Sequence, residues 1–184
     1  MVGDASAGAD EVRGRGALWV SAGVIAALGC TPTYDWREVR PEGAAIVALF
    51  PCRPQQHART ADLAGMRLPM RLNVCNGGKE TWALAVTELE HPNQMGAALL
   101  ALRTTAAANF SATQVQTSPL QVLGMTPHEN AMRVTLRGVS AQGAPVDATV
   151  VVFAKGLRVY QATVFGVQID PELSEMFFSG LKLE

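Results

Sequence analysis

Alternating apolar and polar residues predict that much of the chain after residue 40 is β-structure. In residues 67–75 the apolar side chains recur at every second position, with arginine and asparagine between them, as in a strand with one buried face. An Asn-Gly-Gly turn at 76–78 and a second alternating run at 81–89 predict a β-hairpin. Pro69 has no backbone N–H, so we expect the first strand to be an edge strand or to break there.

Further strands are predicted from apolar and β-branched content. The run at 44–51 is short, apolar and ended by a proline, and another short strand is predicted at 120–125. Residues 132–139 alternate again between apolar and polar side chains. The clearest hairpin spans residues 147–166, where Gly156 supplies the positive φ that a tight turn needs.

Two helices are predicted from spacing and capping residues. Asn93 can cap a helix whose apolar residues recur at helical spacing: Met95, Ala98, Leu99, Leu102 and Ala106. Asp170 followed by Pro171 is typical of a helix start, and the expected inner face is Leu173, Met176 and Phe177. The predicted order is three strands, a helix, four strands and a helix. This order indicates a single α+β domain.

An uncharged, largely apolar run of 14 residues lies between Arg15 and Cys30. A helix that spans the hydrocarbon core of a membrane needs about 20 residues. A secretory signal peptide has an apolar segment of about 7 to 15 residues that follows basic residues. The run therefore favours a signal peptide over residues 1–29, with an uncleaved membrane anchor or a buried core helix as alternatives.

The end of this run, Ala27-Leu28-Gly29-Cys30, resembles the lipobox of bacterial lipoproteins. In that motif a small residue precedes a cysteine that is acylated and becomes the mature N-terminus. Gly29 and Cys30 match it, whereas Ala27 stands where the family usually has leucine and Leu28 where it usually has a small residue. The resemblance implies that Cys30 is the lipidation site.

The lipobox resemblance divides the chain into a lipoprotein signal peptide at 1–29, a tether at 30–41 and a single domain at 42–184. It also implies a lipid bilayer as partner, because one acyl chain binds a bilayer marginally and two or more hold it firmly. In that family a residue such as Thr31 after the cysteine, rather than aspartate, favours the outer membrane facing the periplasm over the inner membrane.

If Cys30 is acylated, Cys52 and Cys75 remain, and an even pair in an exported chain indicates a disulfide. Two buried free thiols are the alternative. Strict alternation along 67–75 places Cys75 on the side of the arginines, so the disulfide is expected to need a bulge or a strand end at that position.

The predicted order of strands and helices, with the hairpin and helix at its end, resembles the PsbP-like fold family, whose α/β sandwich implies an antiparallel sheet of about six to seven strands covered by two helices. The residues that carry the resemblance are the hairpin "GLRVYQATVFG" and the helix "ELSEMFFSGLKL", with Tyr160 in the last strand and Phe177, Phe178 and Leu181 in the last helix. The resemblance extends over about residues 41–183. Members of that family are mostly small accessory proteins that bind or organise larger complexes, so it implies an unknown envelope protein as partner.

The chain has no excess of basic over acidic residues of the kind that favours binding to nucleic acid. The first 29 residues hold two of the 15 Lys and Arg residues and three of the 16 Asp and Glu residues, so the remainder carries 13 of each. The densest basic stretch contains Arg53, Arg59, Arg67 and Arg71. It is interpreted as a solvated face, with a phosphate or an acidic partner as the alternative.

No arrangement of residues in the sequence commits the chain to catalysis, a metal or a cofactor. A cysteine–histidine pair and a zinc set of Cys52, His57, Cys75 and His91 are conceivable, but the cysteine–histidine spacings fit no structural zinc pattern. Glu88 and Glu90 share one face of a predicted strand, where most such pairs are solvated. The sequence therefore favours a non-catalytic binding module, with a small envelope enzyme or a carrier of an apolar ligand as alternatives.

Overall fold

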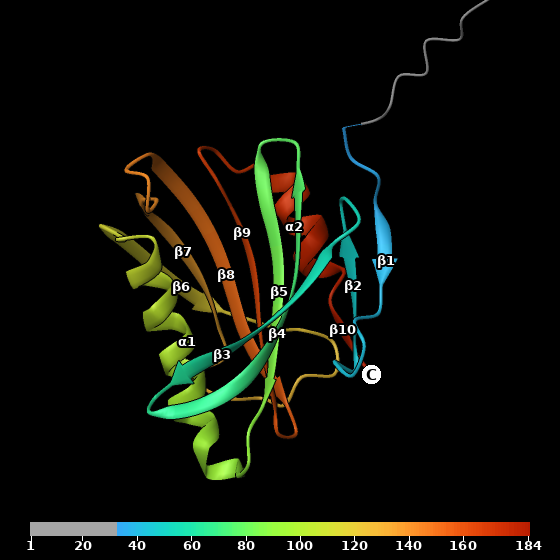
Figure 1. The fold of residues 1–184 in the computed structure, drawn as a ribbon, viewed down its shortest axis with the longest axis vertical. Coiled ribbons are helices and arrows are strands. Elements are labelled where there is room, and N and C mark those ends of the chain that lie inside the picture. The colour runs from blue at the N-terminus through green and yellow to red at the C-terminus, as the bar shows by residue number, and fades with distance from the viewer. Residues whose placement is uncertain (1–32) are drawn as a thin grey trace, which may run out of the picture. The chain divides into compact units, whose positions relative to one another are not determined.

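The computed structural model describes residues 33–184, which form three layers (Figure 1). A seven-stranded sheet lies in the middle, helix α1 covers one face, and helix α2 with a small three-stranded sheet covers the other. The predicted signal peptide, the lipidation site Cys30 and the first residues of the predicted tether lie outside the described residues. No helix within residues 33–184 is long and apolar enough to cross a membrane.

The central sheet is antiparallel throughout and has the strand order β3-β4-β5-β9-β8-β7-β6. Its strands, in chain order, are β3 (Gln55–Leu63), β4 (Met66–Gly77), β5 (Glu80–Glu88), β6 (Gln114–Pro119), β7 (Met132–Val139), β8 (Pro145–Lys155) and β9 (Arg158–Gly166). Strands β3 and β6 are the two edges. The α+β class, the seven antiparallel strands and the two covering helices are confirmed.

The small sheet joins the two ends of the described chain. Strand β2 (Ile46–Phe50) lies between β1 (Arg37–Val39) and β10 (Lys182–Leu183) and is antiparallel to both. Arg37 is opposite Phe50, whereas Leu183 is opposite Ile46 at the other end of β2. Because β1 lies inside the segment predicted as a tether, the folded domain begins before residue 42.

Both faces of the central sheet are buried, which explains the unbroken apolar run of β8. Val150 and Val152 pack towards α1 (Met95–Asn109), whereas Val151 and Phe153 pack towards α2 (Pro171–Ser179) and the small sheet. A strand covered on one face needs only every second residue to be apolar, but a strand covered on both faces needs them all.

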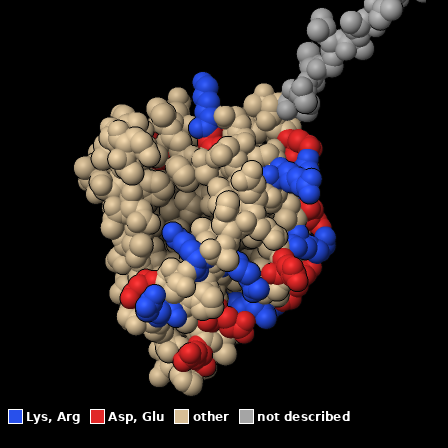
Figure 2. Space-filling view, in the orientation of Figure 1, with Lys and Arg blue, Asp and Glu red and all other residues tan. Residues whose placement is uncertain are grey.

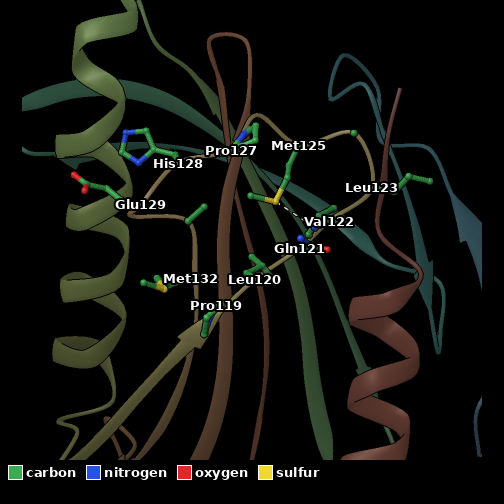
Figure 3. A pocket seen from close by; sticks show the side chains of 12 residues that line it. Pro119, Leu120, Gln121, Val122, Leu123, Met125, Pro127, His128, Glu129 and Met132 are labelled. Carbon is green, nitrogen blue, oxygen red and sulfur yellow. Dashed lines mark hydrogen bonds between the residues drawn. The ribbon is translucent and has the colours of Figure 1, made fainter.

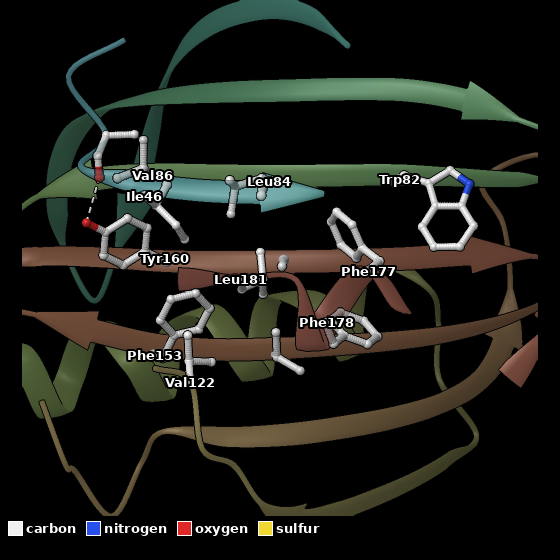
Figure 4. Packing of buried hydrophobic residues seen from close by; sticks show 14 of the residues in the cluster. Ile46, Trp82, Leu84, Val86, Val122, Phe153, Tyr160, Phe177, Phe178 and Leu181 are labelled. Carbon is white, nitrogen blue, oxygen red and sulfur yellow. Dashed lines mark hydrogen bonds between the residues drawn. The ribbon is translucent and has the colours of Figure 1, made fainter. Parts of the chain in front are cut away.

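Aromatic side chains fill the core on the α2 side (Figure 4). Phe177 of α2 packs edge-on against Phe50 and Trp82, with ring centroids 5.2 and 5.5 Å apart, an arrangement that favours aromatic pairs. The Tyr160 hydroxyl donates a 2.7 Å hydrogen bond to the Ala44 carbonyl, marked by the dashed line in Figure 4. Burial raises the pKa of Tyr160 to about 12.

Helix α2 starts as predicted. The Asp170 carboxylate accepts hydrogen bonds from the backbone N–H groups of Glu172 and Leu173 at 2.9 and 3.2 Å, and Pro171 is the first helical residue. The predicted inner face is wrong at Met176, which is 43% exposed. Phe178 is buried in its place, with its ring 5.3 Å from that of Phe177 and packed under the Arg133 guanidinium of β7.

Helix α1 confirms the predicted packing face but not the predicted cap. Ala98, Leu99, Leu102 and Ala106 are buried against the sheet. Residues Pro92–Gln94 form a short 3₁₀ turn, η1, so Gln94 and not Asn93 occupies the N-cap position. Pro92 is the first residue of η1, and its fixed φ favours this turn. Helix α1 therefore begins at Met95, one residue after the start that a cap at Asn93 would give.

Two strand predictions are wrong. Residues 120–125 form an irregular loop, and the strand lies just before them in β6, whose six residues are polar or exposed. Strand β4 does not end at Pro69 and is not an edge strand, because the proline lies where pairing with β5 begins, one residue before the Met70–Thr87 pair. The Pro69 carbonyl accepts a hydrogen bond from the Thr87 hydroxyl at 2.9 Å.

Candidate binding hollow

A hollow in the described part of the chain is bounded by residues 119–132, between β6 and β7 (Figure 3). Its volume is about 930 Å³. We call it the loop hollow. In Figure 3 the loop runs from β6 towards β10 and returns beside α1, with Leu123 at one end of the arch and His128 and Glu129 at the other.

The loop is irregular, but it is anchored at several points. Val122 is buried in the α2-side core, and the Leu123 carbonyl accepts a 2.9 Å hydrogen bond from the Leu183 N–H. The backbone N–H of Thr126 donates to the Ala154 carbonyl at 2.8 Å. The Asn130 side chain donates to the Gly96 carbonyl of α1 at 3.3 Å. The walls of the hollow are therefore held by β10, β8 and α1.

Gly124 fixes the sharpest bend of this loop. Residues 122–125 form a turn closed by a 3.1 Å hydrogen bond from the Met125 N–H to the Val122 carbonyl. Gly124 is the third residue of that turn and has φ +83°, the position and sign that a type II turn reserves for glycine. A Cβ atom there would lie 2.8 Å from the Leu183 carbonyl oxygen, so a side chain would also displace β10.

The lining is mainly apolar and flexible. It includes two methionines, two leucines and two prolines, namely Met125, Met132, Leu120, Leu123, Pro119 and Pro127. Leu123 is 71% exposed, and nothing in the described chain covers its side chain. Methionine side chains adapt to partners of different shape. The hollow can thus hold apolar groups, and its lining carries one acidic side chain, Glu129, and no lysine or arginine.

The predicted disulfide between Cys52 and Cys75 is confirmed. The two Cα atoms are 6.0 Å apart, and the bond joins the end of β2 to β4, near its C-terminal end. Of the two expected features, a bulge is absent, because β4 pairs with β5 without interruption from Met70 to Gly77, whereas the pairing of β4 with β3 ends at Val74, one residue before Cys75. A bulge is not needed, because the arginine side of β4 is the face that β2 covers, and Cys75 is buried there.

The structure separates the four arginines of the basic stretch. Arg67 and Arg71 lie on one face of β4, whereas Arg59 is opposite Met70, on the face that α1 covers. Arg53 precedes β3. No single patch of these four forms within residues 33–184. In Figure 2 the visible charges gather over β1, near the C-terminus and below, and acidic and basic side chains are mixed.

Several residues considered for catalysis or metal binding are engaged elsewhere. The disulfide occupies both cysteines of the conceivable thiolate and zinc sites. Residues 33–184 hold no group of three side chains suited to a metal ion. Glu88 lies 3.7 Å from the Arg158 guanidinium, and Glu90 lies in the exposed turn after β5.

Sequence reasoning missed the loop hollow because its apolar residues resemble a strand. Leu120, Val122 and Met125 gave the run its apolar character, and the available counter-signals were Pro119 before it and Gly124 within it. Proline and glycine mark turns. No known protein-family model matches the chain, and comparison with curated proteins finds no significant match.

Proposed function

We propose that this chain is an exported lipoprotein of the bacterial envelope, and that its domain is a non-catalytic binding module for an envelope protein. In this proposal, the acyl chains on Cys30 anchor the protein in the membrane, and the loop hollow binds the partner. A lipobox-type signal at residues 1–29 would direct export, and the outer membrane facing the periplasm is favoured over the inner membrane. A PsbP-like relationship would agree with an accessory role.

The observation that carries the proposal is the disulfide between Cys52 and Cys75. Disulfides persist in oxidising compartments such as the bacterial periplasm and are rare in the cytosol. The pairing also leaves Cys30 as the single remaining cysteine, at the end of the apolar run. Both facts support an exported chain with one cysteine free for acylation.

The position of β1 keeps the domain close to the proposed anchor. Strand β1 begins at Arg37, so six residues separate it from Cys30. Six extended residues reach at most about 21 Å. A partner of the loop hollow would therefore be a protein of the membrane itself or one that lies near its surface.

The chemistry of the loop hollow favours apolar protein side chains as its occupant. Leu123 is exposed, the lining is methionine-rich, and Glu129 disfavours an anionic group and accommodates a basic one. We therefore propose a partner segment with apolar side chains flanked by a lysine or arginine. Such an occupant would cover the exposed leucine without burying an unpaired charge.

Site-specific photo-crosslinking in intact cells tests this proposal. A photoreactive residue at Leu123, which is 71% exposed, is compared with one at Val167, which is 72% exposed and outside the hollow. We expect one partner to crosslink at Leu123 only, through an apolar segment identified by mass spectrometry. Equal crosslinking at both positions, or none at Leu123, would contradict the proposal. Fatty-acid labelling that survives Cys30→Ala would contradict the anchor.

A carrier of an apolar ligand is the second candidate, because 930 Å³ lies within the range of small-molecule pockets, about 300 to 1,000 Å³. Native mass spectrometry of the protein purified from envelopes distinguishes the two. A bound lipid or other apolar molecule that is lost in Leu120→Asp would support the carrier function.

A further inference from the structure

Strand β6 is an edge of the central sheet whose outer side is unpaired. Its one neighbouring strand is β7, and within residues 33–184 no hydrogen bond from any other segment reaches its backbone. In an antiparallel sheet, alternate residues of an edge strand direct their N–H and C=O groups away from the sheet. These groups can pair with the strand of another chain, so proteins usually protect such an edge with charges, a bulge or a covering segment.

Strand β6 lacks this protection. All six of its residues are exposed, and Val115 is 51% exposed. No lysine, arginine, aspartate or glutamate occurs between Arg103 and Glu129, so the strand and the chain on both sides of it are uncharged. In Figure 2 few charged side chains are visible on the side of the molecule where Figure 1 places β6 and β7. A strand added to this edge would therefore displace no segment of residues 33–184 and oppose no charge of β6.

Symmetry determines which residues would face each other if two copies paired through β6. In an antiparallel pair of identical strands, the two-fold axis passes between one residue and its own copy, and both copies use the same surface. Pro119 has no N–H, so the segment available for pairing is residues 114–118, whose centre is Gln116. Around this centre Gln116 faces Gln116 and Val115 faces Thr117. None of these pairs places like charges opposite each other.

The other edge of the sheet, β3, does not allow such pairing. Its middle residue is Arg59, and Asp62 lies near its end. Two copies joined through the middle of β3 would place Arg59 opposite Arg59. Like charges directly opposite each other destabilise a strand pair. Of the two edges, β6 is therefore the one that is complementary to itself.

We propose that β6 binds the β6 strand of a second copy of this chain, so that the two central sheets form one continuous antiparallel sheet about a two-fold axis. The occupant is a second copy because a two-fold contact requires only that β6 match itself, which its uncharged residues do. Residues 114–118 do not line the loop hollow, so this proposal is independent of the proposed function. A standard interface has about 20 to 30 residues a side, so five paired residues predict a weak, reversible dimer.

Disulfide crosslinking tests the register of the dimer. Directly opposed residues have Cα atoms about 4.5 to 5.5 Å apart, within the range of a disulfide. In the full chain with Cys30→Ala, under a mild oxidant, we expect Gln116→Cys to give a covalent dimer. Val115→Cys alone should not, because its own copy lies about 8 Å away, whereas an equal mixture of Val115→Cys and Thr117→Cys should. Gln56→Cys, exposed on β3, is the matched control.

The crosslinking results decide the proposal in either direction. A dimer of Gln116→Cys that forms faster than those of Val115→Cys and Gln56→Cys supports it. No covalent dimer of Gln116→Cys, or equal crosslinking at all three positions, would overturn it.

Sedimentation equilibrium of the same Cys30→Ala chain, without added cysteines, tests whether the dimer forms unaided. We expect the dimer fraction to rise with concentration and to be lost in Gln116→Lys and in Gln116→Glu, because like charges then face each other. An equal mixture of these two variants should restore the dimer, and Gln56→Lys, the matched control, should leave it unchanged. A chain that stays monomeric would leave β6 to a strand of another protein and overturn the proposal. A dimer that persists in Gln116→Lys would also overturn it.

Discussion

The disulfide should account for a measurable part of the stability of the domain. Cys52 and Cys75 are 23 residues apart, and closing a loop of that length removes chain entropy from the unfolded state worth about 3 kcal/mol at 25 °C. For a domain of this size each kcal/mol corresponds to about 2 to 4 °C in Tm, so reduction should lower Tm by about 6 to 12 °C.

Reduction should also act unevenly across the structure. The bond joins the small sheet, through the end of β2, to β4 of the central sheet. The short strand β1 pairs only with β2, whereas β8 has a partner strand on both sides. Amide exchange after reduction is therefore expected to increase first in β1 and β2 and least in β8, because regions with fewer buried contacts open more easily.

The assay is thermal unfolding followed by circular dichroism, with and without dithiothreitol, in a Cys30→Ala background that leaves only the paired cysteines. The matched control is the same protein with Cys52→Ala and Cys75→Ala, in which dithiothreitol should change nothing. A Tm that falls by less than 2 °C on reduction would refute the entropy argument. An increase in exchange that is greatest in β8 would refute the assigned role of the bond.

Three further changes test other parts of the structure. Gly124→Ala should destabilise the domain by about 1 to 3 kcal/mol in urea titration, because alanine is strained at φ +83° and its Cβ would clash with the Leu183 carbonyl; Gly143→Ala, also at positive φ but in open space, is the control and should cost less. Phe177→Ala should cost about 3 to 5 kcal/mol by leaving a cavity beside Trp82, and a loss below 1 kcal/mol would contradict this packing. Because the pKa of Tyr160 is raised to about 12 in the folded state, stability should be intact below pH 10 and fall between pH 10 and 12. A pH dependence in that window that persists in Tyr160→Phe would contradict the assignment.

The sequence was informative wherever a local pattern determines a local structure. The hairpin at residues 147–166, the cap at Asp170 and the buried face of α1 follow from periodicity, turn chemistry and capping, and each is confirmed. Strand β3 gave no such signal. Six of its nine residues are polar and seven are exposed, because it is an edge strand whose pairing with β4 is made through the backbone.

The features that failed depend on segments far apart in the chain. Asn73 belongs to the polar face of β4, yet it is 2% exposed, because other segments of the chain cover that part of the face. The same covering explains why Cys75 needs no bulge. The run at 120–125 is apolar because Val122 anchors a loop in the core. The spacing of apolar residues within one segment carries no information on these long-range contacts.

The arrangement of β1 and β10 about β2 determines how the domain responds to a pulling force. The chain enters the small sheet beside Phe50 and leaves it beside Ile46, at opposite ends of the same strand. Tension between the N-terminal side and the C-terminus therefore acts along the strands. The hydrogen bonds of the β1–β2 pair and of the β10–β2 pair are then loaded in shear, so the bonds of a pair must break together and not one after another. Forced unfolding is governed by the unfolding rate. If Cys30 fixes one end in a membrane, a load on the C-terminus would first meet these two short ladders.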